Sequence, residues 1–254
     1  MGQSKLSADG FTANLSQRIL EDESIISGVE GTLYANRQDD RSLSYSMVAY
    51  DILERFTPSL QASILEVCCG AGHLAHYLYK HSRNKNITAT DESTELIKAA
   101  QKRYAQEPIR FEVQNVLNHA YQKQSDVVVC MDSFHHFPDP IPSLKHLLKL
   151  VKDGGHLYII DLARNCPIDL IQKRQKVMKN PHEQKRLLRS INASFTSIEM
   201  EANLALAGTD NYQVIYPRKF SEANVDYHTK WIANDDVKEH LYERKFWISI
   251  INNI

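Results

Sequence analysis

The chain has 254 residues, 43% of them hydrophobic and 24% charged, which is close to the composition of an average globular protein. Thirty Lys and Arg residues against 31 Asp and Glu residues give a formal net charge of -1, which excludes a strong overall field for nucleic acid or membrane surfaces. No apolar run approaches the ~20 residues of a membrane span, and the first residues lack the apolar stretch of a secretory signal. The cysteines form no Cys-x-x-Cys pair and are expected to stay reduced; they are Cys68, Cys69, Cys130 and Cys166. We therefore expect a cytoplasmic protein that does not span a membrane.

Apolar patterning predicts an α/β fold. Residues 1–41 are polar and suggest short helices and loops, and the spacing of Leu43, Met47 and Leu53 predicts a helix over 42–56. Strands and helices then alternate: strands are predicted over 62–69, 86–91, 110–115, 125–131 and 156–161, and helices over 72–82, 93–104 and 140–152. This order is typical of a Rossmann-like, doubly wound, mostly parallel sheet. Ligands of such sheets bind outside the carboxyl ends of the strands.

The remainder of the chain is predicted to extend this sheet. Helices are expected over 167–180, 181–192 and 194–208, the first two forming a helical lid after the fifth strand. Strands over 211–220 and 245–253 are expected to form an antiparallel edge pair. We predict one domain over 1–254, with a helical N-terminal extension (1–60), a cofactor-binding core (61–161), a lid and helix (162–220) and a closing segment (221–254).

A strand, a glycine turn and a helix start follow one another in ILEVCCGAGHLA, residues 64–75. Gly70 and Gly72 let a ligand approach the backbone and the helix N-terminus, and they fit the dinucleotide pattern G-x-G-x-x-A. Asp91, 19 residues after Gly72, can accept hydrogen bonds from the ribose hydroxyls of either NAD or S-adenosylmethionine. Glu66 distinguishes between these two cofactors. A carboxylate within an apolar strand needs a partner such as the amino group of S-adenosylmethionine, and it would repel the pyrophosphate of NAD.

At these residues the sequence resembles the class I S-adenosylmethionine-dependent methyltransferases, in their small-molecule branch. The resemblance runs over about residues 60–217 through EVCCGAG, ITATDES, QNV, MDSFHHFPDP, LVKDGGHLYIID and SINASFTSIEMEANLALAG, with Cys68 where the family usually has a glycine. It implies S-adenosylmethionine as cofactor and S-adenosylhomocysteine (SAH) as product. The implied cofactor-binding residues are Glu66, Cys68, Gly70, Gly72, Asp91, Glu92, Asn115, Val116, Met131 and Asp132, with Asn115 at the adenine amino group.

Two histidines follow the fourth predicted strand, and they are the candidate catalytic residues. His135 or His136 can accept a proton from the acceptor, or can simply brace the loop. His135 is preferred, because Phe134 and Phe137 are expected to anchor the loop inward. Asp132, Asp139 and Asp161 lie near the histidines in sequence, but their spacing fits no metal site, so no metal is expected.

Acceptor recognition is assigned to segments outside the core. Tyr45 and Arg41, from residues 34–47, and Arg164, after the fifth strand, are the candidate substrate-binding residues. The predicted lid is basic, with Lys173, Arg174, Lys176, Lys179, Lys185, Arg186 and Arg189 against Glu183. These charges either form the solvated face of amphipathic helices or meet an anionic substrate, a carrier protein or RNA. A small molecule, which can be anionic, is the expected acceptor; nucleic acid is not expected, and the sequence does not indicate the oligomeric state.

Three other functions stay open at this stage. An RNA or protein methyltransferase is disfavoured because no recognition module is evident and the fourth strand does not lead into an Asn/Asp-Pro-Pro-Tyr/Phe motif. A cyclase-like protein that binds the cofactor without transferring methyl would present the same cofactor site. An NAD-dependent oxidoreductase is disfavoured by Glu66 and by the lack of a Tyr-x-x-x-Lys motif.

Overall fold

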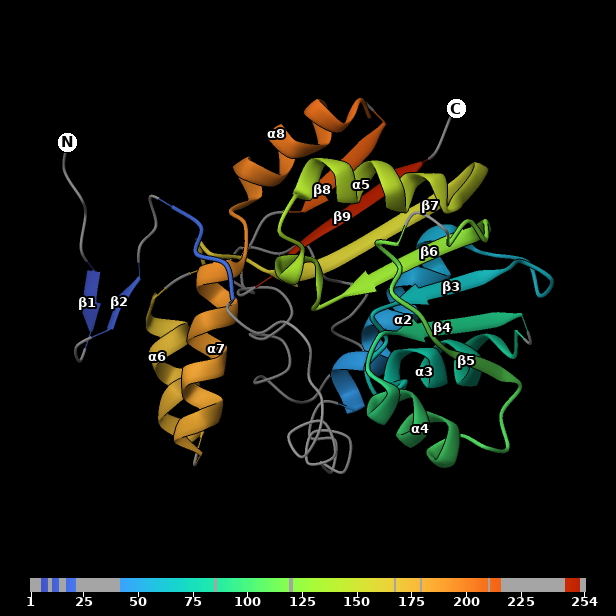
Figure 1. Ribbon diagram of the computed structural model, residues 1–254, viewed down its shortest axis with the longest axis horizontal. Helices are drawn as coiled ribbons and strands as arrows, with labels where there is room; N and C mark the ends of the chain where they lie inside the picture. The colour runs from blue at the N-terminus through green and yellow to red at the C-terminus, as the bar shows by residue number, and fades with distance from the viewer. Residues whose placement is uncertain are drawn as a thin grey trace.

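A seven-stranded sheet forms the centre of the computed structural model (Figure 1). The structure describes residues 6–8, 11–13, 17–21, 42–84, 86–118, 121–166, 168–178, 180–209, 211–215 and 245–251. The strand order is β5-β4-β3-β6-β7-β9-β8. Its parallel part comprises β3 (Ile64–Val67), β4 (Ile87–Asp91), β5 (Ile109–Val113), β6 (Ser125–Met131) and β7 (Val151–Leu162). The predicted antiparallel edge is confirmed, since β9 (Lys245–Ile251) pairs antiparallel with both β7 and β8 (Tyr212–Ile215).

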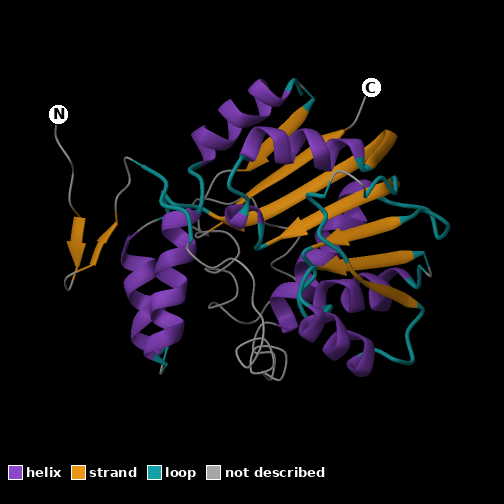
Figure 2. Ribbon diagram, in the orientation of Figure 1, coloured by secondary structure: helices purple, strands orange, loops and turns teal. Residues whose placement is uncertain are grey.

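Helices cover both faces of the sheet (Figure 2). One face packs against α2 (Ser42–Phe56), α3 (His73–Ser82) and α4 (Thr94–Arg103), and the other against α5 (Pro140–Lys149) and α8 (Ser197–Ala207). Because both faces are covered, the central strands are continuous apolar runs, as in ILEV and SDVVVCM. This pattern is why the sequence predicted the doubly wound fold.

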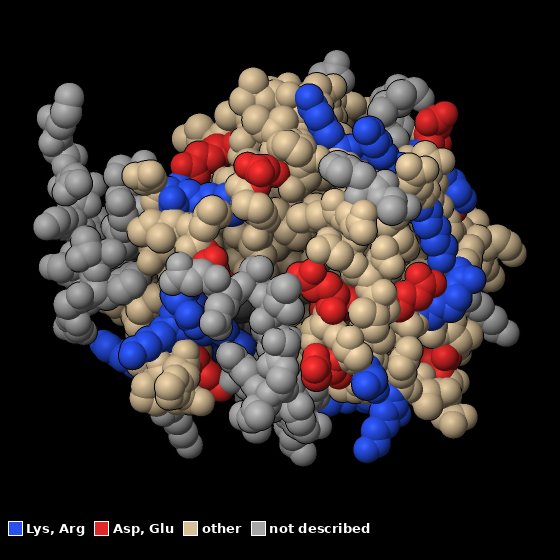
Figure 3. All heavy atoms as spheres, viewed as in Figure 1, with Lys and Arg blue, Asp and Glu red and all other residues tan. Residues whose placement is uncertain are grey.

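Two further helices, α6 (Ile168–Val177) and α7 (Pro181–Ala193), form a pair beside the sheet (Figure 1). Ile171 and Ile191 bury their side chains against Leu162 and Cys166, so the pair has an apolar inner face. Lys176, Lys185 and Arg189 of this pair are exposed to solvent. Figure 3 shows Lys and Arg side chains gathered over these helices. The two helices lie close to the ranges that the sequence predicted, 167–180 and 181–192, while their role as a lid stays a prediction.

The main differences from the prediction concern the N-terminal extension, the end of α5 and the start of α8. The N-terminal extension was expected to be helical, but β1 (Leu6–Ala8) and β2 (Phe11–Ala13) pair as a short antiparallel hairpin. The helix expected to reach residue 152 ends at Lys149, and β7 begins at Val151. Gly155 lies within β7, and an added Cβ there would lie 2.7 Å from the Asp126 carbonyl oxygen of β6. This glycine therefore permits the two strands to approach closely. The third late helix begins at Ser197, because Thr196 and Glu199 form a capping box.

Helix α2 is anchored to the sheet by a buried acid. Asp51 accepts a hydrogen bond of 2.8 Å from the hydroxyl of Tyr158, which is fully buried on β7. Arg55, one turn later on α2, binds the other oxygen of the same carboxylate at 3.0 Å. None of the helices in the described residues is long and apolar enough to cross a membrane.

We predict that Asp51→Ala lowers the free energy of unfolding by about 1–3 kcal/mol, because the buried Tyr158 hydroxyl loses this acceptor. Urea denaturation of Asp51→Ala, Tyr158→Phe and the double variant should show that the two losses are not additive. Glu54→Ala, on the exposed face of the same helix, is the control. Equal losses for Asp51→Ala and Glu54→Ala would contradict the anchoring role.

Candidate functional site

The candidate site lies at the carboxyl edge of the parallel sheet. β3 is the central strand here, flanked by β4 on one side and β6 on the other, so the chain reverses its direction of winding at this point. The predicted residues at the ends of β3, β4 and β6 therefore come to one edge, as the sequence predicted for a topological switch point.

The turn after β3 has a backbone that suits glycine. Gly70 and Gly72 have φ values of 55° and 79°, and Cys68 also lies in the left-handed region, at 54°. An added Cβ on Gly72 would lie 2.5 Å from Cε1 of Phe111, so no other residue fits there without a shift. Gly72 directly precedes α3 and, as a glycine, supplies no side-chain cap to this helix. The turn therefore places a helix N-terminus beside Glu66 and Asp91, an arrangement that suits a polar ligand.

Glu66 is buried in β3, one residue before the strand ends. It lies between Ala89 of β4 and Val129 of β6 and is only 3% exposed. Its Oε2 atom has no hydrogen-bond partner in the described part of the chain. Burial raises the pKa of this carboxyl group to about 8, although the backbone amide of Ala75 binds it. A carboxylate with one oxygen left without a partner, beside a glycine turn, fits a ligand that brings a cationic or donor group.

A polar rim follows β4 and β5. Asp91 accepts hydrogen bonds from the amides of Gly70, at 2.8 Å, and Ser93, at 2.9 Å, which hold its carboxylate against the glycine turn. The Asn115 side-chain amide donates to Glu92 at 2.8 Å and accepts from the Leu117 amide at 2.9 Å. The structure thus joins four predicted cofactor residues, while their ribose and adenine contacts stay predictions.

The other cofactor candidates differ in exposure. Val116 and Met131 are buried, at 3% and 7%, and belong to the apolar core. Asp132 has a φ of 52° and donates its amide to the Ile160 carbonyl oxygen, which turns the chain sharply after β6. These residues lie at the same edge as Glu66, as expected.

The substrate candidates are not brought together. Tyr45 stacks on His73, the first residue of α3, with ring centroids 5.4 Å apart. Arg41 lies outside the described residues. Arg164 is 1% exposed; it forms an ion pair with Glu199 and donates to the Ser194 carbonyl oxygen. These contacts give Arg164 a role in joining β7 to α8, which the sequence did not indicate.

The histidines form a short 3₁₀ turn, η1 (Phe134–His136). Phe134 and Phe137 are buried, which confirms the expected inward anchoring. Nδ1 of the buried His135 lies 2.7 Å from Asp161 Oδ1, and its backbone amide donates to Oδ2 at 2.7 Å. Burial alone lowers the pKa of His135, but the Asp161 carboxylate outweighs it and raises that pKa. Asp161 therefore fixes the orientation of the imidazole and leaves Nε2 as its second nitrogen.

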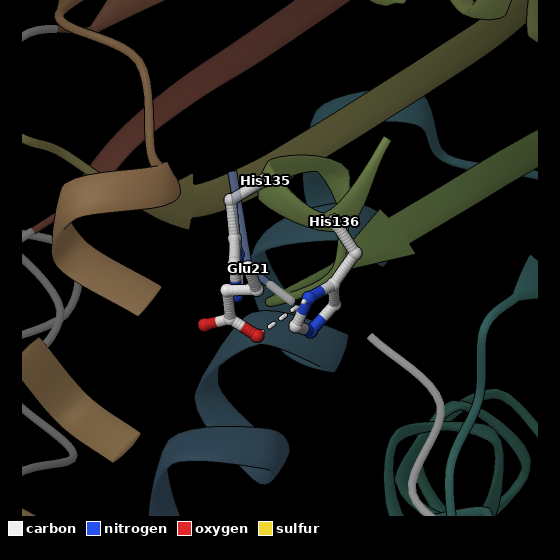
Figure 4. A group of neighbouring side chains, drawn as sticks. All are labelled: Glu21, His135 and His136. Atoms are coloured by element: carbon white, nitrogen blue, oxygen red, sulfur yellow. Dashed lines mark ion pairs between the residues drawn. The ribbon is translucent and has the colours of Figure 1, made fainter. Parts of the chain in front are cut away.

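Two residues of this region were missed by sequence reasoning. The Arg18 guanidinium donates to the carbonyl oxygens of His135 and Phe137, at 2.8 and 2.7 Å. Glu21 forms an ion pair with His136 at 3.1 Å, drawn as the dashed line in Figure 4. Both residues are more than 110 positions from the turn in sequence and belong to no motif, so no local signal could have placed them there.

Known proteins share this architecture. Ubiquinone biosynthesis O-methyltransferase of Yersinia pestis (strain Pestoides F) is 29% identical over 148 residues, a match that covers 54% of this chain and only 60% of that protein. The plantazolicin methyltransferase BpumL, solved with a triazolic desmethylPZN analog and SAH, has a TM-score of 0.66 at 22% identity, covering 88% of this chain and 89% of that one. A putative S-adenosyl-L-methionine-dependent methyltransferase from Methanococcus maripaludis has a TM-score of 0.63 at 19% identity, over 93% of this chain and 98% of that one.

The match to a family model agrees with the motifs and the sheet. The model described as a methyltransferase domain covers residues 36–213, which includes the glycine turn, the polar rim and the histidine turn. The protein therefore belongs to the methyltransferase domain family, as its resemblance to the class I S-adenosylmethionine-dependent enzymes predicted.

Proposed function

We propose that the protein is an S-adenosylmethionine-dependent methyltransferase that acts on an O, N or C nucleophile of a small molecule. The observation that carries this proposal is the buried Glu66 carboxylate, whose Oε2 lacks a partner in the described residues beside the glycine turn. The amino group of the cofactor's methionine part supplies the cation that this oxygen lacks. Asp91 and Glu92 then offer acceptors for the ribose, and Asn115 an amide for the adenine.

The known relatives support the same reaction class. The Yersinia relative carries the name of an O-methyltransferase, and the plantazolicin methyltransferase was solved with SAH. Because the match covers only 60% of the Yersinia protein, the acceptor of that enzyme is not carried over. The four cysteines, all unpaired in the structure, support the cytoplasmic location, and the basic lid supports an acceptor with negative charge.

The chain's own residues mainly orient the reactants. When bound, the cofactor supplies a methyl group on a positively charged sulfur, which is already activated for transfer. Catalysis then needs alignment, exclusion of water and, for a hydroxyl acceptor, removal of a proton. We assign proton acceptance to Nε2 of His135, because Asp161 holds Nδ1 at 2.7 Å. His136 follows on the same turn and is the second candidate.

Glu66→Gln should weaken SAH binding by about 10- to 100-fold, because a neutral amide cannot pair with the ammonium group of the ligand. Isothermal titration calorimetry measures this change, with NADH in a parallel titration. Glu112→Gln on β5, whose side chain is 42% exposed, is the matched control. SAH affinity that is equal in both variants, or binding of NADH alone, would contradict the assigned cofactor.

The raised pKa of Glu66 makes SAH binding depend on pH. Below about pH 8 the unliganded carboxyl group holds a proton, and pairing with an ammonium group favours its release. Affinity should therefore rise between about pH 6 and pH 8, with proton uptake by the buffer, and Glu66→Gln should remove this rise. Calorimetry in buffers of different ionisation enthalpy measures the released protons. A flat profile in the unmodified protein would refute the pairing.

His135→Ala should lower turnover about 100-fold or more and leave SAH affinity nearly unchanged, because the imidazole acts on the acceptor. An acceptor found by screening with labelled methyl donor provides the assay. His81→Ala, exposed at the far end of α3, serves as the control. Nearly normal turnover of His135→Ala would remove this residue as the base.

A further inference from the structure

We infer that Glu21, His135 and His136 form a binding site for a divalent transition metal ion of the Zn²⁺ class. One ligand atom from each residue lies within 4.8 Å of the other two, and Figure 4 shows the three side chains gathered beside η1. Two imidazoles and one carboxylate are ligands that Zn²⁺ and its first-row neighbours bind. No metal was expected from the sequence because only acids close to the histidines along the chain were candidates, whereas Glu21 comes from the N-terminal segment.

His135 has the second partner that metal-binding histidines usually have. Its Nδ1 atom lies 2.7 Å from the buried Asp161 carboxylate, which leaves Nε2 as the nitrogen that can face an ion. Carboxylates in this position orient the ring and make the metal-binding nitrogen more basic. The His135 and His136 rings lie with centroids 4.0 Å apart, so the second imidazole is already beside the first.

Glu21 is held in place in the same way. Ser190 of α7 donates a hydrogen bond of 2.7 Å to Glu21 Oε1, and Oε2 lies 3.1 Å from His136 Nδ1. The Glu21 side chain is only 7% exposed. His136 Nδ1 is buried, and its contact with Glu21 helps to lower the pKa of that carboxyl group. An ion between the two would satisfy both atoms.

The segment that carries Glu21 is fixed on both sides of the turn. Arg18 donates to the carbonyl oxygens of His135, Phe137 and Ala193, and its guanidinium lies 4.1 Å from the centre of the Phe195 ring. The Ile19 amide donates to the Asn192 carbonyl oxygen at 3.0 Å. Since these contacts place Glu21 before any ligand arrives, the site loses little entropy when it binds an ion.

The spacing of the ligands suits a tetrahedral ion after small side-chain movements. Metal–nitrogen and metal–oxygen bonds of about 2.0–2.1 Å place two ligand atoms about 3.4 Å apart. Glu21 Oε2 and His136 Nδ1 lie 3.1 Å apart, close to that value, and all three ligand atoms lie within 4.8 Å of one another. Three protein ligands leave one position for water or another small ligand, which is the pattern of an exchangeable site.

This site has a consequence for the reaction, which rests on the proposed function. His135 Nε2 cannot accept a proton while its lone pair binds a metal ion. The metal-loaded protein is therefore the inactive form, and the metal-free protein is the active one. Cofactor binding is not affected, because Glu66 and the glycine turn contribute no ligand to the ion.

The test is titration of the chelator-treated, full-length protein with Co²⁺, followed by competition with Zn²⁺. We expect one ion per chain, visible absorption typical of tetrahedral Co²⁺, and at least about 10-fold weaker binding by Glu21→Gln. Glu21→Gln keeps the shape of the side chain and an acceptor for Ser190. The matched control is Glu107→Ala, which removes a glutamate that pairs with His76 at 2.6 Å but belongs to no three-ligand cluster in the described residues.

SAH calorimetry on the same samples separates this proposal from the previous one. Co²⁺ binding that Glu21→Gln leaves unchanged, or that Glu107→Ala weakens equally, would overturn the metal site even if SAH binds normally. Co²⁺ binding as expected without SAH binding would overturn the cofactor proposal and leave the metal site standing. Zn²⁺ should also inhibit turnover without weakening SAH, and turnover insensitive to a bound ion would refute the competition for His135.

Discussion

The rest of the site depends on one electrostatic constraint, the burial of the Glu66 carboxyl group in the middle of an apolar sheet. A carboxylate without a cation is costly there, and its pKa accordingly rises to about 8. The paired residues on the neighbouring strands, Ala89 and Val129, carry no charge, and the backbone amide of Ala75 compensates the burial only in part, so a cation has to come from a ligand. The glycine turn lies directly after this position, and a ligand with an amino group that binds there can gain affinity by offsetting the cost of the buried carboxylate.

A second buried acid, Asp161, lies beside the proposed catalytic histidine and, unlike Glu66, has its partner within the protein. Asp161 is the penultimate residue of β7, as Glu66 is of β3, but its carboxylate binds His135 through both the ring and the backbone amide. This pairing holds the pKa of Asp161 below its ordinary value despite complete burial. The two acids thus have different roles. Glu66 keeps one oxygen available for a ligand, whereas both oxygens of Asp161 bind His135 and orient its ring.

The sheet and the cofactor edge could be predicted because their signals are local. Continuous apolar runs, the glycines at 70 and 72 and the acid at 91 are each visible within a few residues. Arg18 and Glu21 could not be found, since their partners lie more than 110 residues away and charged residues in a polar segment carry no periodicity. Arg164 was assigned to the acceptor because it follows a strand end, yet the ion pair with Glu199 on a later helix decides its position. Long-range polar contacts are what the sequence leaves open.

The same long-range contacts couple the lid to the histidine turn. Segment 17–21 binds α7 through Ser190, Asn192 and Ala193, and it binds η1 through the carbonyl oxygens that Arg18 holds. If α7 moves away to admit an acceptor, the segment must release either α7 or the turn, because it cannot follow both. Releasing α7 would keep His135 in place but separate Glu21 from Ser190; releasing the turn would separate Glu21 from His136. An ion held by Glu21, His135 and His136 would allow only the first of these movements, and would thereby tie the N-terminal segment to the turn.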